Sequence, residues 1–397
     1  MNIIVLDTGD PIECSGGQGV FVRNVVTSSR HAMTVAGTVP DGITLGRAVD
    51  RSSNYGTVRS LPIAHHGSAG RRPFVPERLR CAIGALRYMG RVPHADMFYV
   101  SSAELLLGAL LWRRGRPVVF QIHGAGNALA VSRYRWARTP VLVRLYDWLW
   151  VALLRRVDLI LSVDDAGCDR ARSCDIRVKC AVLPPMYDES LFCSSLSDRQ
   201  PGRLIYAGRL EEAKHVEMIL RAVGILRARG VEVSLDVVGD GSERAALEAL
   251  AVSERVSEWC TFLGWVPQDE LAARLRRASL FVLASRQEGV TTAVLESLAC
   301  GTPAITRPIG GLGAVITQGV NGRLWTGGDV SSLADEVADA LSQTWDPAAV
   351  SATVSRFSRS EVIKKLDAQL EDLQRQTRSG RDCANTGSSR CPKSGGS

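Results

Sequence analysis

The chain has 397 residues, of which 45% are hydrophobic and 22% charged, so it is long enough for two domains of ordinary size. This composition excludes a largely disordered chain, and the lack of any long uncharged apolar run excludes a membrane-spanning helix. The net charge is +7: residues 1–200 hold 25 basic and 17 acidic side chains, and residues 201–397 hold 23 and 24. The basic first half suits an anionic membrane surface, a phosphorylated substrate or simply an Arg-rich solvated surface.

Ten cysteines are scattered along the chain, without a Cys-x-x-Cys pair or a histidine at zinc-site spacing. Cys168, Cys174 and Cys180 recur at equal intervals, and we expect them to be structural thiols. The chain opens directly on an apolar strand, without the charged segment that starts a signal peptide. The sequence therefore predicts a cytoplasmic protein with reduced thiols, either in solution or peripheral at the inner face of the membrane.

The first half begins with a β-α-β unit, which is typical of a parallel, doubly wound sheet. Apolar runs predict strands at residues 3–6 and 33–37, with a helix over residues 20–29 between them. Gly17 and Gly19 stand at the loop-to-helix junction, where a missing side chain lets the backbone approach a ligand. The pattern is not the G-x-G-x-x-G fingerprint of dinucleotide binding, and a plain flexible loop would also explain it.

A histidine follows a strongly predicted strand of the first half. Residues 118–122 form that strand, and His123 stands at its C-terminal end, where parallel sheets bind ligands. We expect His123 to be either a substrate contact or a structural histidine. Residues 142–157 predict a helix that combines tryptophans with arginines, which suits a membrane surface or a core helix with a basic end.

Two basic side chains follow the first strand of the second half. Residues 204–206 predict this strand, and Arg209 and Lys214 lie between it and a helix over residues 216–229. Arg binds phosphate through two parallel hydrogen bonds and Lys binds it as a point charge. The C-terminal end of this strand is therefore a candidate phosphate site.

Two carboxylates lie eight positions apart in the segment from residue 278 to residue 306. The segment predicts a strand, a loop, a helix and a second strand, with Thr291 and Thr292 as candidate N-cap residues. Glu288 lies on the loop and Glu296 inside the helix. A helix N-terminus at this position favours anions, so carboxylates beside it indicate recognition of hydroxyl groups.

These features together indicate one class of ligand. Two successive α/β sheets provide two rows of strand ends, which is where such sheets bind ligands. The basic side chains and the helix N-terminus suit a diphosphate, and the carboxylates suit sugar hydroxyls on either side of it. The sequence therefore predicts a nucleotide sugar.

The spacing Glu288-x7-Glu296 is similar to a motif of retaining glycosyltransferases with the GT-B fold, and the chain resembles their family 4, also called glycosyl transferases group 1. The segments LPPMYDESLF, YAGRLEEAKH, VVGDGSERAALEALA, FLGWVPQDEL and EGVTTAVLESLACGTPAI carry the resemblance from residue 183 onward. SGGQGVFVRNVV and QIHG carry it in the first half. It covers about residues 1–373 and is strongest over residues 204–326.

The resemblance implies an α/β fold of the GT-B class, with two Rossmann-like domains facing across a cleft. The acceptor-binding domain is expected at residues 1–195 and the nucleotide-sugar-binding domain at residues 200–358. A C-terminal helix over residues 359–374 would cross back to the first domain. Residues 375–397 lack apolar periodicity, and we expect a disordered tail there.

The resemblance also implies roles for the candidate site residues. Glu288 would contact the transferred sugar and Glu296 the ribose, while Arg209 and Lys214 would bind the diphosphate. His123 would lie near the reacting centre, so the implied catalytic residues are His123, Glu288, Arg209 and Lys214. The other donor-binding candidates are Gly17 and Gly19 for close backbone approach, Gly264 and Val266 for the base, and Gly289, Val290, Thr291 and Thr292 near the sugar.

The chain departs from the family pattern at two positions. His215 follows Lys214 where the family usually has glycine. Val290 stands two residues after Glu288 where Phe or Leu is common, which leaves the preferred sugar open.

The expected reaction moves a hexose-type sugar from a nucleotide-diphosphate sugar to an acceptor hydroxyl with retention of anomeric configuration. Basic side chains and a helix N-terminus would stabilise the negative charge on the leaving diphosphate. Because no Asp-x-Asp occurs in the chain, we expect no metal, and no cofactor beyond the nucleotide sugar. The acceptor would be a sugar, a lipid-linked molecule or another small molecule. A peripheral contact with an anionic membrane is compatible with the basic first half, and no nucleic-acid partner is expected.

Two other functions remain open on the same fold, and two further classes of enzyme need features that this sequence does not clearly provide. A nucleotide-sugar 2-epimerase would form product without an acceptor, and a non-catalytic GT-B subunit would neither bind nor hydrolyse the donor. A sugar phosphorylase would need a pyridoxal-phosphate lysine on a longer chain, and only five lysines occur here, none of them clearly suited to that role. A nicotinamide oxidoreductase would need the fingerprint that is absent after the first strand.

Overall fold

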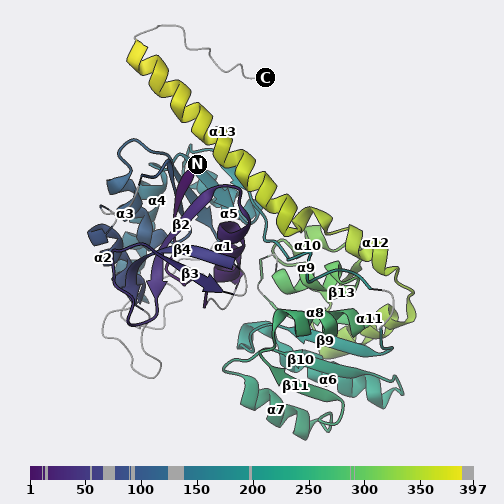
Figure 1. The fold of residues 1–397 in the computed structure, drawn as a ribbon. Helices are drawn as coiled ribbons and strands as arrows, with labels where there is room; N and C mark the ends of the chain where they lie inside the picture. The colour runs from purple at the N-terminus through teal and green to yellow at the C-terminus, as the bar shows by residue number, and fades with distance from the viewer. Residues whose placement is uncertain are drawn as a thin grey trace. The chain divides into compact units, whose positions relative to one another are not determined.

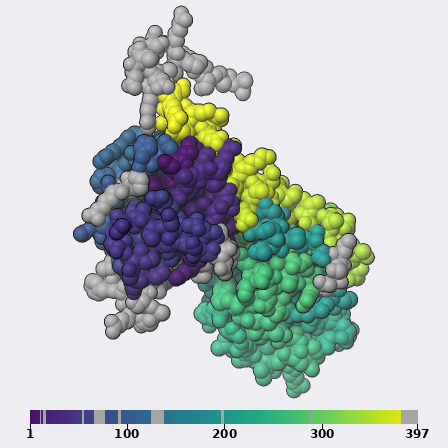
Figure 2. Space-filling view, in the orientation of Figure 1, coloured from purple at the N-terminus to yellow at the C-terminus, as the bar shows by residue number. Residues whose placement is uncertain are grey.

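The computed structural model describes residues 1–10, 12–13, 17–53, 56–65, 77–88, 90, 94–123, 138–195, 199–286, 288–289 and 291–386. The chain divides into two units (Figures 1 and 2), the first mostly purple and blue, the second mostly teal and green. Met1–Leu183 and the segment from Ile363 onward form the first unit, and Pro184–Val362 form the second. Each unit is a Rossmann-like α/β sheet, which confirms the predicted fold class.

The first unit has an eight-stranded sheet in the order β3-β4-β2-β1-β5-β6-β7-β8. Its strands are β1 (Asn2–Leu6), β2 (Ala32–Val39), β3 (Val49–Ser53), β4 (Gly56–His65), β5 (Met97–Val100), β6 (Val118–Ile122), β7 (Leu159–Ser162) and β8 (Cys180–Val182). Its helices are α1 (Gly17–Ser28), α2 (Glu77–Tyr88), α3 (Ala103–Trp112), α4 (Pro140–Leu154), α5 (Asp165–Ser173) and most of α13 (Arg359–Thr386). Among the described strands of this sheet, only β3 runs antiparallel, to β4.

The strand order reverses beside β1. The chain passes from β1 to β2 on one side, and later returns to pair β5 with the other side of β1. The apolar runs of these strands are buried because helices cover the sheet, and residues of α2, α3, α4 and α5 complete the core on one face. The C-terminal ends of β1 and β5 therefore form a topological switch point, the usual ligand site of such sheets.

The second unit has a fully parallel six-stranded sheet in the order β11-β10-β9-β12-β13-β14. Its strands are β9 (Arg203–Ala207), β10 (Ser234–Val238), β11 (Cys260–Gly264), β12 (Leu280–Leu283), β13 (Ala304–Thr306) and β14 (Gly322–Leu324). Its helices are the 3₁₀ helix η3 (Glu212–Lys214), α6 (Val216–Ala228), α7 (Arg244–Ser253), α8 (Gln268–Arg277), α9 (Thr292–Ala299), α10 (Leu312–Val315), α11 (Val330–Ser342), α12 (Pro347–Ala352) and the 3₁₀ helix η4 (Ser355–Phe357).

Helix α9 illustrates how local sequence produces this unit. Six of its eight residues are buried, so the helix is covered on most sides by the second core. It ends where Gly301 adopts a positive φ of 78°, and Pro303 follows two residues later. The next strand, β13, then pairs in parallel with β12, as the predicted strand–helix–strand order requires.

The unit boundary lies earlier than the sequence suggested. The first domain was expected to end at residue 195, whereas the second unit begins at Pro184. Tyr187 donates a backbone hydrogen bond to Phe357 of the second unit at 3.1 Å, and Phe192 is buried in the second core. Polar composition alone placed the linker too late. Tyr187 and Phe192 precede the polar residues 193–203, and both belong to the core of the second unit.

Helix α13 extends beyond residue 374, where the helix was expected to end. It continues to Thr386, which differs from the expected disorder after residue 375; residues 387–397 lie outside the described part of the chain. No proline interrupts the helix, and Gln376 Nε2 donates to Asp372 Oδ2 at 2.8 Å, one turn back. Within the first unit, Asp367 of α13 accepts from Ser29 Oγ at 2.6 Å.

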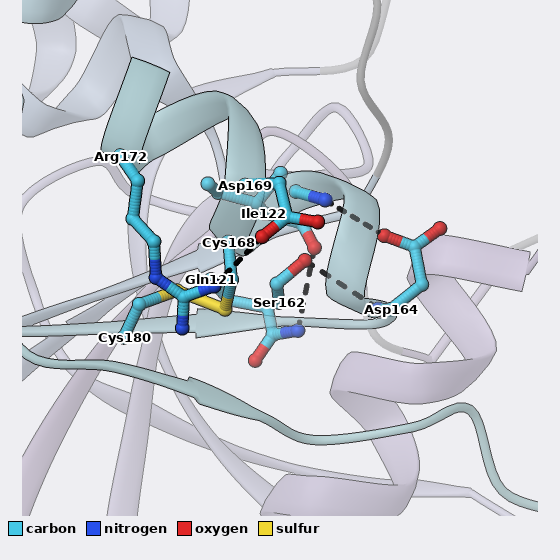
Figure 3. The surroundings of a disulfide bond; sticks show 9 residues. Gln121, Ile122, Ser162, Asp164, Cys168, Asp169, Arg172 and Cys180 are labelled. Carbon is cyan, nitrogen blue, oxygen red and sulfur yellow. Dashed lines mark hydrogen bonds and ion pairs between the residues drawn. A yellow bond between two sulfur atoms is a disulfide. The ribbon is translucent and has the colours of Figure 1, made fainter. Parts of the chain in front are cut away.

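A disulfide joins Cys168 in α5 to Cys180 at the start of β8, with their Cα atoms 5.7 Å apart (Figure 3). This corrects the expectation of reduced thiols at both positions. The bond forms because α5 packs against β7 and β8, which brings the two cysteines within bridging distance. The spacing of the cysteines in the sequence does not reveal this contact. Cys174, the third residue of the run, is free.

Among the described helices, none is both long enough and apolar enough to cross a membrane.

Candidate functional site

The second unit has its own switch point between β9 and β12. The chain leaves β9 toward β10 and β11, and then returns to pair β12 with the other side of β9. The loop from Gly208 to His215 follows β9, and the loop from Ala284 to Thr291 follows β12. Neighbouring parallel strands thus bring together the segments that the sequence singled out.

Lys214 and Glu288 form an ion pair at this switch point. Their side chains are only 18% and 11% exposed, so each charge is largely removed from water and neutralised by the other. Ser285 Oγ donates a second hydrogen bond to the same carboxylate oxygen at 2.9 Å. The pair joins the end of η3 to the loop after β12.

Backbone contacts hold the two loops in place. Arg286 N donates to Ala213 O at 3.3 Å, which links the loop after β12 to η3. Gly310 has a φ of +52°, and a Cβ at this position would overlap the carbonyl oxygen of Glu288. Glycine at residue 310 is therefore required both by its conformation and by the close approach of the Glu288 backbone.

Glu296 lies in α9, one turn beyond its first residues, and its side chain is nearly fully buried. Burial raises the pKa of its carboxyl to about 7, because the charged form loses its hydration. Thr291 occupies the N-cap position of α9 without capping it through its side chain. Thr292 is the first residue of the helix and Gly289 is exposed, while Val290 lies outside the described residues.

Arg209 follows β9 on the exposed side of the site. Its side chain is 61% exposed, and Nη1 donates to Glu211 Oε1 at 2.6 Å. The buried hydroxyl of Tyr206 donates to the Arg209 carbonyl at 2.9 Å, which fixes the backbone while the guanidinium faces solvent. The structure thus places Arg209 at the same strand end as Lys214.

The C-terminal end of β11 carries the segment expected to line a base. Gly264 has a φ of 68°, and its carbonyl accepts from Gly239 N at 2.8 Å. The indole of Trp265 is exposed, and Val266 is partly buried against the second core. These residues lie two strands away from β9 within the same sheet.

Arg307 is a further basic residue at a strand end of the second sheet, and the sequence patterns did not indicate it as a site residue. It follows β13 directly, and its Cζ lies 4.1 Å from the centroid of the Trp325 ring. Its Nε is buried, and no described group accepts a hydrogen bond from it. Burial, and then the charge of Arg286, lower the pKa of the Arg307 guanidinium. Its position at a strand end of the parallel sheet was the available signal.

The switch point of the first unit holds a buried carboxylate. Asp7 follows β1 and accepts hydrogen bonds through Oδ1 from Ser101 Oγ at 2.5 Å, Gln18 Nε2 at 2.9 Å and Ser102 Oγ at 3.1 Å. Helix α1 begins at Gly17, earlier than expected, so Gly17 and Gly19 both lie in its first turn. The glycines therefore start the helix instead of preceding it.

His123 follows β6 and lines a cavity of about 120 Å³ in the first unit. Its ring meets Phe21 edge to face, with centroids 5.3 Å apart. Burial lowers the pKa of the imidazole to about 4, with an opposing contribution from Asp7, so the ring is neutral at pH 7. Its Nε2 is buried, and no hydrogen-bond partner exists for it in the described part of the chain.

Opposite charges line the rest of this cavity. Arg78 Nη1 donates to Glu104 Oε1 at 3.0 Å, and Arg170 lies 3.8 Å from Asp147. Arg170 also lies over the ring of Trp150, 5.3 Å from its centroid. The cavity therefore offers both donors and acceptors of hydrogen bonds beside the unpartnered His123 nitrogen.

Comparison with family models matches both halves of the chain. Residues 15–191 match the model described as Glycosyltransferase Family 4, and residues 189–354 match that of Glycosyl transferases group 1. The D-inositol 3-phosphate glycosyltransferase of Corynebacterium jeikeium is 32% identical over 366 residues, 83% of each chain. The glycogen synthase of Mycobacterium tuberculosis is 35% identical over 169 residues, so the match spans only 40% of that protein's length.

Solved structures share the fold at low sequence identity. Sucrose-phosphate synthase from Thermosynechococcus elongatus has a TM-score of 0.73 at 18% identity, covering 96% of this chain and 99% of its own. Anabaena HepE in complex with UDP-glucose has a TM-score of 0.68 at 16% identity, covering 94% and 100%. With the two family models and the full-length relative, these similarities show that the chain belongs to family 4 of the glycosyltransferases, with the GT-B fold.

Proposed function

We propose that the protein transfers a hexose-type sugar from a nucleotide-diphosphate sugar to an acceptor hydroxyl, with retention of anomeric configuration and without a metal ion. The observation that carries the proposal is the largely buried ion pair between Lys214 and Glu288 at the switch point of the second unit. A buried carboxylate with a cationic partner is costly to maintain for stability alone, since apolar residues would often serve as well. The pair is better explained as two ligand-binding groups that neutralise each other until a donor enters.

Donor binding divides this pair between two parts of the ligand. The ammonium of Lys214 passes to the diphosphate, and the carboxylate of Glu288 accepts hydrogen bonds from hydroxyls of the transferred sugar. A ligand that carries only one of the two groups would separate Lys214 from Glu288 and leave the other charge without a partner. Such a ligand therefore gains less binding free energy. This arrangement favours a nucleotide sugar over a free sugar or an inorganic phosphate.

The remainder of the donor site follows from the strand ends. Glu296 suits the ribose hydroxyls, because a carboxyl with a pKa near 7 can both donate and accept hydrogen bonds. The exposed indole of Trp265 and the backbone near Gly264 and Val266 suit a base, which stacks on aromatic faces. Structures similar in fold bind UDP or UDP-glucose, so UDP sugars are the first donors to test.

The leaving diphosphate gains negative charge as the glycosidic bond breaks. Arg209, Lys214 and the N-terminus of α9 stabilise this charge, which is the largest catalytic contribution we assign. The acceptor oxygen forms its new bond on the face from which the diphosphate departs, and its proton passes to an oxygen of the diphosphate. No protein nucleophile is assigned, and the nucleotide sugar is the only small molecule besides the acceptor.

The acceptor binds in the cavity beside His123. Its alternating charges suit a polyhydroxylated molecule, whose hydroxyls both donate and accept hydrogen bonds. Neutral His123 then hydrogen-bonds a substrate hydroxyl through Nε2, which satisfies a buried polar atom that has no partner in the described residues. A sugar or another small hydroxylated molecule fits this site, and a lipid-linked acceptor would present its head group here.

A thermal-shift screen of nucleotide sugars tests donor binding, followed by transfer assays on the hits. Lys214→Gln and Glu288→Gln should each abolish the donor-induced rise in melting temperature. Arg221→Gln and Glu254→Gln provide a matched control, because these residues form an exposed ion pair at 3.2 Å elsewhere in the second unit. Full transfer activity of Glu288→Gln with the true donor would overturn the assignment of the sugar contact.

Assays with and without acceptor separate the rival functions. Product that requires an acceptor supports transfer, whereas an epimerised nucleotide sugar formed without any acceptor would indicate a 2-epimerase. Neither binding nor hydrolysis of any nucleotide sugar would indicate a non-catalytic subunit.

A further inference from the structure

Exposed apolar side chains are concentrated on three helices of the first unit. In the described part of the chain, thirteen large hydrophobic residues are exposed, and nine of these lie on α2, α3 and α4. Scattered single residues of this kind are normal on a protein surface, but a cluster marks an interaction site. The other four are spread over the rest of the molecule.

Helix α4 presents the most exposed of these residues. Val141, Leu145, Trp148 and Leu149 are 74%, 56%, 68% and 42% exposed. Their spacing of three and four residues places them on one side of the helix, roughly opposite Leu154, which is buried in the core. The helix therefore has two apolar sides, and only one of them is covered.

The neighbouring helices extend this surface. Leu79, Ile83 and Leu86 are exposed on one side of α2, and Leu107 and Leu111 on one side of α3. The three helices lie side by side in chain order, α2 against α3 and α3 against α4 (Figure 1). Together the nine side chains form what we call the apolar face of α2, α3 and α4.

Positive charge is concentrated in the same segment. Residues 77–156 contain 13 arginines and 4 carboxylates, a net charge of +9, so the rest of the chain carries −2. Arg78, Arg87, Arg144, Arg155 and Arg156 are exposed, whereas all four carboxylates are partly buried. Exposed arginines therefore occur on α2 and α4 and directly after α4, beside the side chains of the apolar face.

Arg144 lies within the apolar stripe of α4, three residues after Val141 and four before Trp148. Arg155 and Arg156 continue the same spacing beyond the end of the helix. Apolar residues with an exposed Trp, flanked by arginines, are the pattern of helices that rest in the interface of an anionic bilayer. A symmetric pairing of two copies would instead bring arginine against arginine, which opposes self-association.

We propose that the apolar face of α2, α3 and α4 docks on an anionic membrane surface, with Trp148 and its neighbours in the lipid interface and the surrounding arginines at the head groups. This inference is independent of the reaction assigned above. It predicts that the full-length chain binds vesicles of phosphatidylglycerol and phosphatidylcholine in equal parts, and does not bind phosphatidylcholine alone. Binding should weaken as salt increases, because salt screens the arginines.

Matched variants isolate the surface in a vesicle co-sedimentation assay. Val141→Glu with Leu145→Glu should reduce the partition coefficient at least about tenfold, since it places charge in the lipid interface. Val252→Glu with Val320→Glu should leave binding unchanged, because Val252 and Val320 are 68% and 44% exposed on the second unit. Arg144→Gln with Arg156→Gln should lower partition roughly fivefold per arginine. Melting temperatures of all variants establish that they fold.

Three results would overturn the proposal. In the first, the wild-type chain would fail to sediment with the anionic vesicles. In the second, the double variant at Val141 and Leu145 and the double variant at Val252 and Val320 would lose binding equally. In the third, the chain would form a dimer in size-exclusion chromatography that Val141→Glu disrupts, without vesicle binding, which would assign the face to a second copy. Hydrolysis of a soluble donor should be the same in all these variants, so failure of the membrane proposal is separable from failure of the proposed reaction.

Discussion

Lys214 and Glu288, separated by 74 positions in the sequence, form an ion pair across the two central strand ends of the second sheet. Each residue had been assigned to a different part of the donor, so their mutual contact means that the donor-free site is already electrically balanced. Donor affinity therefore depends on how well the diphosphate and the sugar hydroxyls of the donor replace the contact between Lys214 and Glu288.

Breaking the pair should be costly in the absence of ligand. Lys214→Gln or Glu288→Gln alone leaves a largely buried charge without its partner, and we expect a loss of about 1–3 kcal/mol in the free energy of unfolding. The double variant should recover part of this loss, which denaturant titration of the four proteins will measure as a coupling energy. Lys365→Gln, at an exposed position on α13, is the control. Additive losses would show that the two charges do not interact. In transfer assays, Lys214→Gln should lower kcat by about 10²–10³-fold.

Gly310→Ala should disturb the loop that carries Glu288. A methyl group there would overlap the Glu288 carbonyl and would occupy a positive φ, so we expect a loss of about 2–4 kcal/mol in stability and a raised KM for the donor. Gly313→Ala is the matched control, because nothing lies near its added Cβ. Equal melting temperatures for the two variants would mean that residue 310 does not hold the loop.

Glu296 makes stability depend on pH. Its folded pKa of about 7 exceeds the ordinary value of 4.5, so its contribution to stability is full below pH 4.5 and is lost as pH rises through 7. At pH 8 the wild type bears the cost of a buried charge, and Glu296→Gln should be more stable by about 3 kcal/mol. Near pH 4 the two proteins should match. Denaturant titration at both pH values checks this, and a difference that does not change with pH would contradict it. The same variant should bind the donor more weakly.

His215→Gly should stabilise the protein. His215 has φ 50° and ψ 41°, a left-handed conformation that costs a non-glycine residue about 1 kcal/mol. Part of the gain is offset, because the ring contacts Glu217 Oε1 through Nδ1 at 2.8 Å. Glu217→Gln measures that contact by itself. A melting temperature of His215→Gly below that of Glu217→Gln would show that the ring contributes more than the strain costs.

Removing the disulfide should destabilise the first unit. The bond closes a loop with a sequence separation of 12, so replacing both Cys168 and Cys180 by Ser should cost about 3 kcal/mol. Wild-type protein treated with a thiol reductant should show a similar loss, and the double variant should not respond to reductant. Cys193→Ser, at an exposed free cysteine, controls for thiol loss as such. An untreated wild type that unfolds like the double variant would contradict the bond.

Much of the second sheet could be predicted from the sequence. The strand at Leu280–Leu283, the helix start at Thr291 and Thr292, and the placement of Glu288 on the intervening loop all follow from apolar runs and cap residues. Strand ends of a parallel sheet meet at one edge, so Arg209, Lys214 and Glu288 were expected to lie near one another. These are consequences of local pattern plus a general rule of topology.

Other features depend on tertiary distances that no local pattern encodes. The bond between Cys168 and Cys180 requires α5 to lie against β8, and the neighbouring Cys174 has the same spacing but remains free. The raised pKa of Glu296 requires that the core close over α9. Arg307 was missed because a lone arginine after a strand is common, and only its buried Nε distinguishes it. The role of each site residue in the reaction stays a prediction.

Cys168 and Cys180 can be oxidised to the disulfide or reduced to thiols, depending on whether a thiol reductant is used in purification. The helix that carries Cys168 contributes Gly167 and Arg170 to the wall of the cavity beside His123. Protein purified with a thiol reductant and protein purified without one are therefore two chemical species with the same sequence, and they differ by a bond in a helix that lines this cavity. Acceptor screens on this chain should be run on both species, with the thiol content of each sample titrated beforehand.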